Sequence, residues 1–190
     1  DNAKIRSLIF DKITDPEILK SIVLNSQKSD VRLDLVSKLD DEELLSQIAC
    51  NDSDKIVRSE AVKKIKDESV LEDILSSEED RFVRQIAVNN ITNPQLLIKI
   101  AIEDEDQFVR NHAISNPALV DEKDFEYIAI NSTDEEIAKE ALTHISSEKS
   151  FIEILKNAKL SVIRKSTLDN ISDLETLIRI VLANEDEEFS

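Results

Sequence analysis

The 190-residue sequence contains no glycine, no methionine and no tryptophan, and it has only three prolines and one cysteine. A chain without glycine forms few tight turns that need a positive backbone φ angle, which disfavours β-rich folds. The absence of glycine also excludes the glycine-rich loops that bind phosphate groups and the nucleophile elbow of hydrolases. The single cysteine, Cys50, excludes an intramolecular disulfide and fits a reducing compartment. We therefore expect a cytoplasmic protein, with Cys50 as a buried structural thiol beside Ile48 and Ala49.

Long hydrophobic runs are also missing. No stretch approaches the roughly 18–20 apolar residues that a membrane-spanning helix needs, and the longest run, from Leu96 to Ile102, is interrupted by Lys99. The first residues do not resemble a signal peptide. The sequence predicts no interaction with a membrane. Because residue 1 is Asp rather than Met, we expect the chain to be processed or to be an excerpt of a longer protein.

Positive charge is scarce, since the formal net charge is −17. Such a field repels free DNA and RNA, whose affinity for proteins depends on lysines and arginines that neutralise phosphates. The acidity either keeps the protein in solution or attracts a basic partner. Aromatic residues are only 4% of the chain, so leucine, isoleucine, valine and alanine must form the core.

A repeated pair of residues dominates what the sequence does contain. The pair Val83-Arg84 recurs at Val109-Arg110 and is preceded at the same interval by similar pairs. This regular period, about 26 residues, lies in the range that is typical of a repeat array. One copy has lost its arginine, and that copy and the one after it are shifted slightly out of phase. The full series is Ile5-Arg6, Val31-Arg32, Val57-Arg58, Val83-Arg84, Val109-Arg110, Ile137-Ala138 and Ile163-Arg164.

Each repeat has the pattern of two helices. Asp54 and Asp67 are suitable N-caps for the two helices of one repeat, and Asp15-Pro16 and Asn93-Pro94 place proline at the first helical position. Apolar residues follow at helical spacing. In the second helices isoleucine holds one equivalent place in every repeat. We predict about fourteen helices between residues 4 and 184, with a frayed segment from 185 to 190. The isoleucines of that place are Ile22, Ile48, Ile74, Ile100, Ile128, Ile154 and Ile180.

One repeat is irregular. The segment after Asn116-Pro117 is two residues longer than its counterparts, and the following helix carries Phe125 and Tyr127 where other repeats have aliphatic or charged residues. Ala138, where the arginine is lost, belongs to the same region.

The motif Asp-x-x-Val-Arg-x-x-Ala-Val-x-x-Ile, followed by a second apolar helix, resembles HEAT-like repeats. The stretch from Val109 to Pro117, with Val-Arg and Asn-Pro, is also similar to the leucine-rich repeat variant family. The resemblance implies an all-α fold, a right-handed α-α superhelix (HEAT-like solenoid) of about seven two-helix repeats that form one domain over residues 1–190. It also implies that the Val-Arg helices line the concave side. The iron–sulphur cluster of leucine-rich variant proteins is not supported, because one cysteine cannot hold it.

The sequence indicates no catalytic residue, no metal site and no cofactor. The repeated arginines are expected to form a structural ladder with aspartates of neighbouring repeats, and a ligand role is the alternative. His112 and His144 lack the neighbouring ligands that a metal site needs, and Glu140 is placed for an i, i+4 contact with His144. The acidic run Glu103–Asp106 lacks the glycine of an EF-hand loop.

The exposed positions of the Val-Arg helices form the candidate binding surface. In the middle of the array these positions carry no full charge, whereas lysines lie on the same face towards the N-terminus. Amides on a shallow groove can recognise an extended peptide, and the lysines can steer an acidic partner. Alternatively, the amides only cap helices and binding occurs on the acidic edge. This predicted strip comprises Gln85, Asn89, Asn90, Asn111, His112, Ser115 and Asn116, with Lys38, Lys63 and Lys64 beside them.

The sequence therefore favours a non-enzymatic scaffold that binds a protein or peptide along its concave face. HEAT-like solenoids include DNA glycosylases and lyases, so an enzyme is the alternative, although a glycosylase needs a basic groove and aromatics around the extruded base. A purely structural segment of a larger protein is the third possibility. Ile9 and Phe10 do not resemble the polar face of a terminal repeat, so we expect an array that is cut at both ends and associates end to end, with its oligomeric state left open.

Overall fold

The computed structural model describes the backbone of residues 2–187 and the side chains of residues 4–182. Within these residues the protein is all-α, with fourteen α-helices, one 3-10 turn and no strand. None of these described helices combines the length and the apolar character that crossing a membrane requires. The chain divides into two compact units, Asp1–Thr92 and Asn93–Ser190.

The first unit contains α1 (Asn2–Phe10), α2 (Pro16–Asn25), α3 (Ser29–Val36), α4 (Glu42–Asn51), α5 (Lys55–Val62), α6 (Glu68–Ser77) and α7 (Arg81–Asn90). The second contains α8 (Pro94–Glu103), α9 (Gln107–Ile114), α10 (Glu122–Asn131), α11 (Glu135–Thr143), α12 (Glu148–Asn157), α13 (Ser161–Thr167), the 3-10 turn η1 (Leu168–Asn170) and α14 (Leu174–Glu187). The odd-numbered helices carry the Val-Arg pairs and are the Val-Arg helices below. The even-numbered ones are the partner helices.

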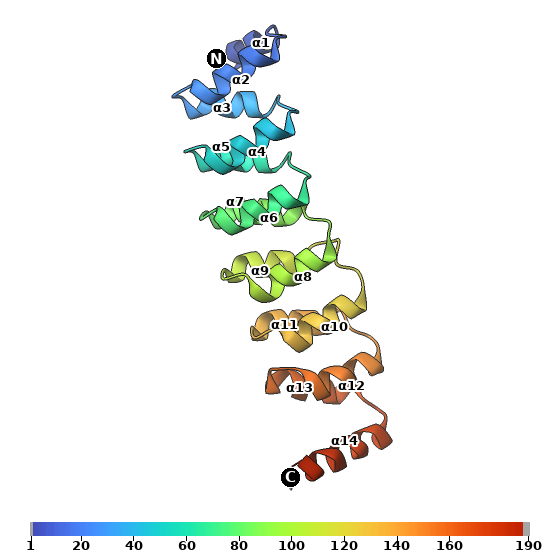
Figure 1. The fold of residues 1–190 in the computed structure, drawn as a ribbon. Helices are drawn as coiled ribbons and strands as arrows, with labels where there is room; N and C mark the ends of the chain where they lie inside the picture. The colour runs from blue at the N-terminus through green and yellow to red at the C-terminus, as the bar shows by residue number, and fades with distance from the viewer. Residues whose placement is uncertain (1, 188–190) are drawn as a thin grey trace. The chain divides into compact units, whose positions relative to one another are not determined.

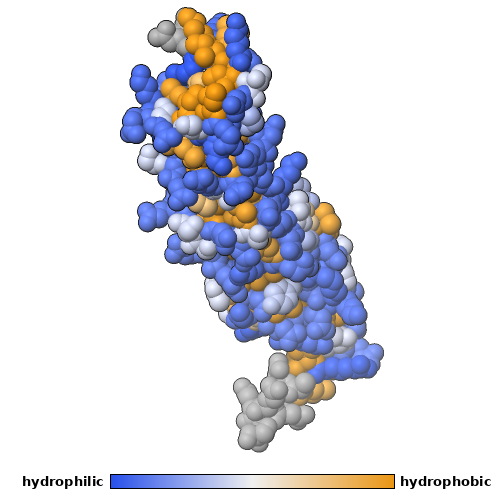
Figure 2. All heavy atoms as spheres, turned by 45° about the horizontal axis from the view of Figure 1, so that its top comes forward, coloured by the Kyte–Doolittle hydropathy of each residue, from blue (hydrophilic) through white to orange (hydrophobic). Residues whose placement is uncertain are grey.

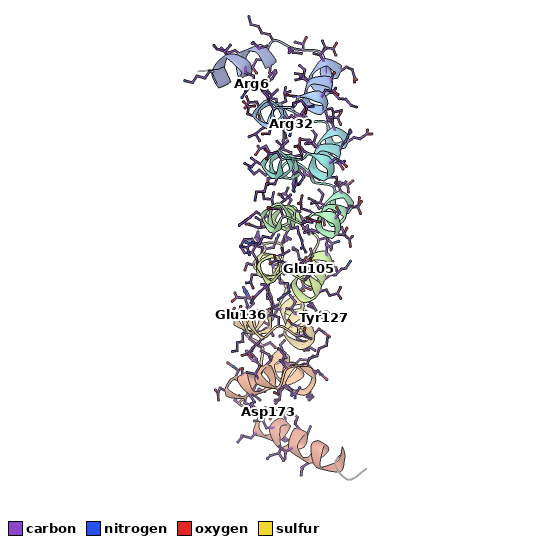
Figure 3. All side chains as sticks on the ribbon, turned by 90° about the vertical axis from the view of Figure 1, so that its left-hand side faces the viewer. Arg6, Arg32, Glu105, Tyr127, Glu136 and Asp173 are labelled. Atoms are coloured by element: carbon purple, nitrogen blue, oxygen red, sulfur yellow. The ribbon has the colours of Figure 1, made fainter. Side chains whose placement is uncertain are left out.

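Each unit has two layers of helices. In the first unit α3, α5 and α7 pack side by side, α4 packs on α6, and each partner helix from α2 to α6 packs on the Val-Arg helix that follows it (Figure 1). The second unit repeats the arrangement, with α9, α11 and α13 in one layer and α8, α10 and α12 in the other. Many helices of each unit are seen end-on in Figure 3, where the two layers form two columns.

Side-chain caps determine where the helices begin. The carboxylate of Asp54 accepts a hydrogen bond from the Ile56 N–H, and Asp67 accepts from the N–H groups of Ser69 and Val70. Asp15 and Asn93 cap helices whose first residue is proline, because the N–H that proline lacks would be unpaired there in any case. These four predicted caps are confirmed. No described residue has a positive φ angle, which explains how every connection is made without glycine.

The predicted core is confirmed. The valines and alanines of the Val-Arg helices and the isoleucines of the partner helices point into the space between the layers. Exposed fractions do not exceed 7% for the eight predicted residues, Val57, Val83, Val109, Ala61, Ala87, Ala113, Ile74 and Ile100. Small side chains at the alanine positions let the helices of the two layers approach closely.

The arginines form a ladder between neighbouring repeats. Arg58 donates from Nη1 to the carbonyl oxygen of Asp52, and from Nε and Nη2 to the carboxylate of Glu78. Arg32 does the same with the Ser26 carbonyl and the Asp52 carboxylate. The predicted ladder is therefore present, but its acids are not the predicted N-cap aspartates. In these two repeats the acid stands 20 residues after the arginine, at the C-cap of the next partner helix.

A second ladder runs through the partner helices. Glu42, the first residue of α4, accepts from the N–H groups of Lys66 and Asp67, both at 3.1 Å. Glu122 and Glu148, which hold the same place in α10 and α12, accept from residues 24 and 25 positions further on. Proline has no carboxylate, so α8, which begins with Pro94, cannot make this link. The two extra residues of the irregular repeat follow that helix, before α10.

The irregular repeat also alters the arginine ladder. The Nη2 of Arg110 reaches Asp134 at 2.5 Å, and this acid lies further along the chain than the acids of Arg32 and Arg58. The Nε of Arg110 is buried and has no hydrogen-bond partner among the described residues. In the next repeat Ala138 replaces the arginine, and Ala158 stands where the spacing of the regular repeats places the acid. These two alanines are 0% and 1% exposed, so both halves of the ion pair are lost together.

Three sequence predictions need correction. Cys50 is exposed, because it lies on the outer side of α4, one position past the buried Ala49. Its partial desolvation, with the charges of Asp73 and Glu78, raises the pKa of the thiol. The first helix ends at Phe10 rather than near residue 13, and the last continues to Glu187, so residues 185–187 are helical. Residues 188–190 lie outside the described part of the chain.

Candidate functional site

The strip residues of the first unit have different surroundings. Asn89 is exposed and Gln85 is half-buried on α7, and neither side chain has a hydrogen-bond partner within the described residues. Asn90 instead donates from Nδ2 to the carbonyls of Val62 at 2.8 Å and Ile65 at 3.1 Å. Asn90 therefore ties α7 to the end of the preceding Val-Arg helix. That role resembles the cap that the sequence offered as an alternative, except that the capped helix is the neighbouring one.

The three lysines are engaged in ion pairs. Lys38 pairs with Asp11, and Lys63 pairs with Glu60 at 2.8 Å. Lys64 pairs with Asp40 at 3.3 Å and also donates to the carbonyls of Ser37 and Leu39. Lys64 holds the place of Asn90 in the preceding repeat and performs the same linking role. Since each lysine has a carboxylate nearby, their attraction for an acidic partner is weakened.

The strip residues of the second unit also divide. Asn111 and Ser115 are exposed, whereas Asn116 is 5% exposed and its Oδ1 accepts from the Ala118 N–H at 2.8 Å. Asn116 thus holds the turn that starts the irregular segment. His112 packs edge-to-face on Phe108, with ring centroids 4.6 Å apart. Asn111 is the most accessible polar group of this set, because its amide makes no hydrogen bond within the described residues.

Neither histidine lies in a cluster of ligands. His144 stacks on Phe125 with centroids 4.1 Å apart, and its Nε2 lies 3.6 Å from Glu140, which confirms the i, i+4 contact. Across the described residues, His, Cys, Asp and Glu side chains do not form a group of three or more that could hold a metal ion. The two rings therefore cover apolar side chains rather than form a catalytic group.

A groove in the second unit was missed by the sequence analysis. It lies between the outer faces of α8 and α10, has a volume of ≈ 520 Å³ and is closed at one side by Lys159. Helix α8 supplies Ile98, Ile102 and Glu103, and α10 supplies Asp124 and Tyr127. Tyr127, labelled in Figure 3, is 55% exposed. The groove belongs to the irregular repeat, whose extra residues and two aromatics were the signal that could have revealed it.

The cations of the groove are held by the protein itself. The Nζ of Lys159 donates to the Asn131 carbonyl at 2.8 Å, and its backbone N–H donates to the Ile130 carbonyl at 3.0 Å. Lys123 pairs with Glu126 at 2.7 Å. Lysine thus fixes the end of α10 and the rim of the groove.

The carboxylates of the groove are not paired. Neither Glu103 nor Asp124 has an ion-pair or side-chain hydrogen-bond partner within the described residues, and Asp124 is half-buried. Burial and the nearby Asp121 raise the pKa of the Asp124 carboxyl above its ordinary value. Ile98 and Ile102, both half-buried, and the ring of Tyr127 provide apolar surface beside these carboxylates. The groove therefore combines an apolar floor with negative charge that lacks a partner.

Comparison with known proteins adds no name to this geometry. The chain matches no family model. It also matches no curated protein sequence and no solved structure. The function is therefore argued from the residues themselves.

Proposed function

We propose that the protein is a non-enzymatic α-solenoid scaffold, a right-handed superhelix of about seven HEAT-like two-helix repeats, that binds a segment of another protein. Solenoids expose long surfaces suited to such binding. The repeat period, the two layers in each unit and the two ladders support the proposal. The lone cysteine supports a place in the cytoplasm.

The α8–α10 groove is the observation that carries the proposal. A half-buried carboxylate without a partner is costly, and a cation from a ligand removes that cost. The aromatic face of Tyr127 attracts the same cation, while Ile98 and Ile102 accept an apolar side chain. We infer a partner segment in which arginine or lysine alternates with apolar residues. The net charge of −17 speeds the approach of such a segment.

A binding titration tests this proposal. The probe is a fluorescein-labelled peptide of alternating arginine and leucine, and its counterpart has glutamate at each arginine position. We expect the cationic peptide alone to raise the anisotropy, with an affinity that falls as salt is added. Equal binding of the acidic peptide, or no binding of either, contradicts the proposal.

Two groove variants locate the site. Asp124→Asn and Tyr127→Ala should each weaken the cationic peptide tenfold, a loss of about 1.4 kcal/mol. Asp169→Asn is the matched control, because Asp169 is exposed and outside the groove and the charge change is the same. If Asp169→Asn weakens binding as much as Asp124→Asn does, the attraction is unspecific.

The predicted strip remains the competing site, and one variant separates it from the groove. Changing Asn89 and Asn111 together to Gln preserves the charge and shortens no helix. The groove proposal expects unchanged affinity for the cationic peptide. Loss of binding in this variant, with the groove variants unaffected, would place the partner on the Val-Arg helices instead.

A further inference from the structure

Helix α1 exposes an apolar face that is buried in the other Val-Arg helices. Ile9 is 53% exposed, whereas the residues at its place in α5, α7 and α9 are alanines that are 0% exposed. Ile5 is 57% exposed, whereas the valines at its place in those three helices are at most 1% exposed. Leu8 widens the patch, with 63% of its surface exposed. Figure 2 shows hydrophobic atoms gathered over the first helices.

The covering element is known from the inner repeats. Helix α4 packs on α5 and buries Leu45, Ile48 and Ala49 between the layers. Among the described residues no partner helix precedes α1. The exposed face of α1 is thus the half of a repeat that a partner helix covers.

Helix α14 exposes the opposite half. Val181 is 58% exposed, whereas the residues at its place in α4, α8 and α10, all alanines, are at most 1% exposed. Ile178 and Leu182, four residues apart, are 58% and 54% exposed and continue the apolar surface along the helix. In the inner repeats this face of a partner helix is covered by the Val-Arg helix that follows. No Val-Arg helix follows α14 in the described residues.

The two helices are also complementary in charge. The sequence of α1 contains Lys4 and Arg6 and no carboxylate, whereas that of α14 contains Glu175, Glu185, Asp186 and Glu187 with one arginine. Apolar patches of this kind on a protein surface mark an interaction site. Opposite charges on the two helices favour one pairing over the self-pairing of either helix.

We propose that α14 of one copy and α1 of a second copy pack together as the two halves of one repeat. Ile5 and Ile9 would then meet Val181 with the spacing used between α4 and α5. The interface is heterologous, since each copy contributes a different surface. A copy that has paired through α1 still offers its α14, so association continues beyond the dimer or closes into a ring.

A mixing experiment with the full 190-residue chain tests the pairing. One variant, Ile5→Glu with Ile9→Glu, blocks the α1 face. The other, Val181→Glu with Leu182→Glu, blocks the α14 face. By light scattering after size exclusion, we expect the unaltered chain to exceed the monomer mass increasingly with concentration. Each variant alone should be monomeric. The equimolar mixture should reach twice the monomer mass and stop there, because only one intact α14 and one intact α1 remain to pair.

The controls keep the result interpretable. Ile56→Glu and Val120→Glu alter exposed apolar residues, 59% and 82% exposed, on neither face, and both should associate like the unaltered chain. Circular dichroism checks that every variant keeps its helices. A monomeric unaltered chain at high concentration overturns the proposal. So does a variant that dimerises alone, which indicates like-with-like pairing, or a mixture of two folded variants that stays monomeric.

Discussion

Arg58 holds Glu78 through two hydrogen bonds, from Nε at 2.6 Å and from Nη2 at 2.9 Å, across a full repeat. The Glu78 side chain is only 7% exposed. Glu78 also accepts from the N–H of Asp80 at 2.9 Å, so one carboxylate joins the Val-Arg helix α5 to the start of α7. Replacing Glu78 by Gln preserves the shape and removes the charge. We expect a loss of about 1.5–3 kcal/mol, the range for hydrogen bonds to charged groups, in urea unfolding followed by circular dichroism.

The same pair makes stability depend on pH. Burial of Glu78 opposes its ionisation, but the hydrogen bonds from Arg58 and Asp80 outweigh burial and hold the pKa of Glu78 below its ordinary value. The unfolded chain therefore binds more protons than the folded one between the folded pKa and the ordinary pKa of about 4.3. The contribution of the pair is complete above that ordinary value and is lost as pH falls through the folded pKa. In Glu78→Gln this part of the acid destabilisation should be absent.

Asp124 is expected to act in the opposite direction. Because burial raises its pKa in the folded protein, the folded chain binds more protons than the unfolded chain once pH exceeds the ordinary value of about 3.9. Stability therefore falls as pH rises through that window. Asp124→Asn should be more stable than the unaltered protein at pH 7, and the difference should vanish near pH 3. Thermal unfolding at both pH values measures it, and an unchanged or lower midpoint at pH 7 contradicts the expectation.

Truncation of the core should be costly at Ile74. This side chain is 1% exposed between the two layers, and helices on both sides prevent the site from collapsing. Ile74→Ala should lower the free energy of unfolding by about 2–5 kcal/mol. Ile56→Ala, at a residue that is 59% exposed, is the matched control and should cost less than about 1 kcal/mol. Similar losses for the two variants would show that Ile74 is not a core residue.

The alanine pair at 138 and 158 offers a test of the arginine ladder. Ala138→Arg alone places a charge among buried groups without its acid, and we expect a loss on the order of 3 kcal/mol. Ala138→Arg with Ala158→Asp restores the sequence spacing that joins Arg58 to Glu78, and should recover part of that loss. A double-mutant cycle gives the coupling energy. Coupling near zero would show that the ladder geometry does not extend to this repeat.

The helices and the core were predictable because they depend on local chemistry. Asp54 and Asp67 cap their helices in any context, and Ala61 or Ile74 can only be buried at a position that recurs with the repeat. The ladder acids were misjudged because Asp52 and Glu78 lie at C-caps, where a capping pattern does not single out an acid. Cys50 was misjudged because one residue along a helix turns a side chain by about 100°, from the buried face to the outer one.

The candidate groove could be predicted only in part. The two-residue insertion and Tyr127 marked the irregular repeat, but the pairing of Lys159 with the end of α10 depends on a residue 28 positions away. Sequence also could not show that Lys64, Asn90 and Asn116 are occupied in holding neighbouring segments. Their types suited a binding strip equally well, and only their partners distinguish a link from a free amide.

The span of the links between repeats has a consequence for how the chain folds. The ladder bonds of Arg58, Glu42 and Asn90 join residues 20 to 28 positions apart. Closing loops of that size costs little more entropy than closing a hairpin, since the cost grows only with the logarithm of length. Proteins with such low contact order fold within microseconds to milliseconds. A stretch of two adjacent repeats holds every contact that its shared ladder requires, so nucleation can begin at many places along the chain, and early structure forms before distant segments have met.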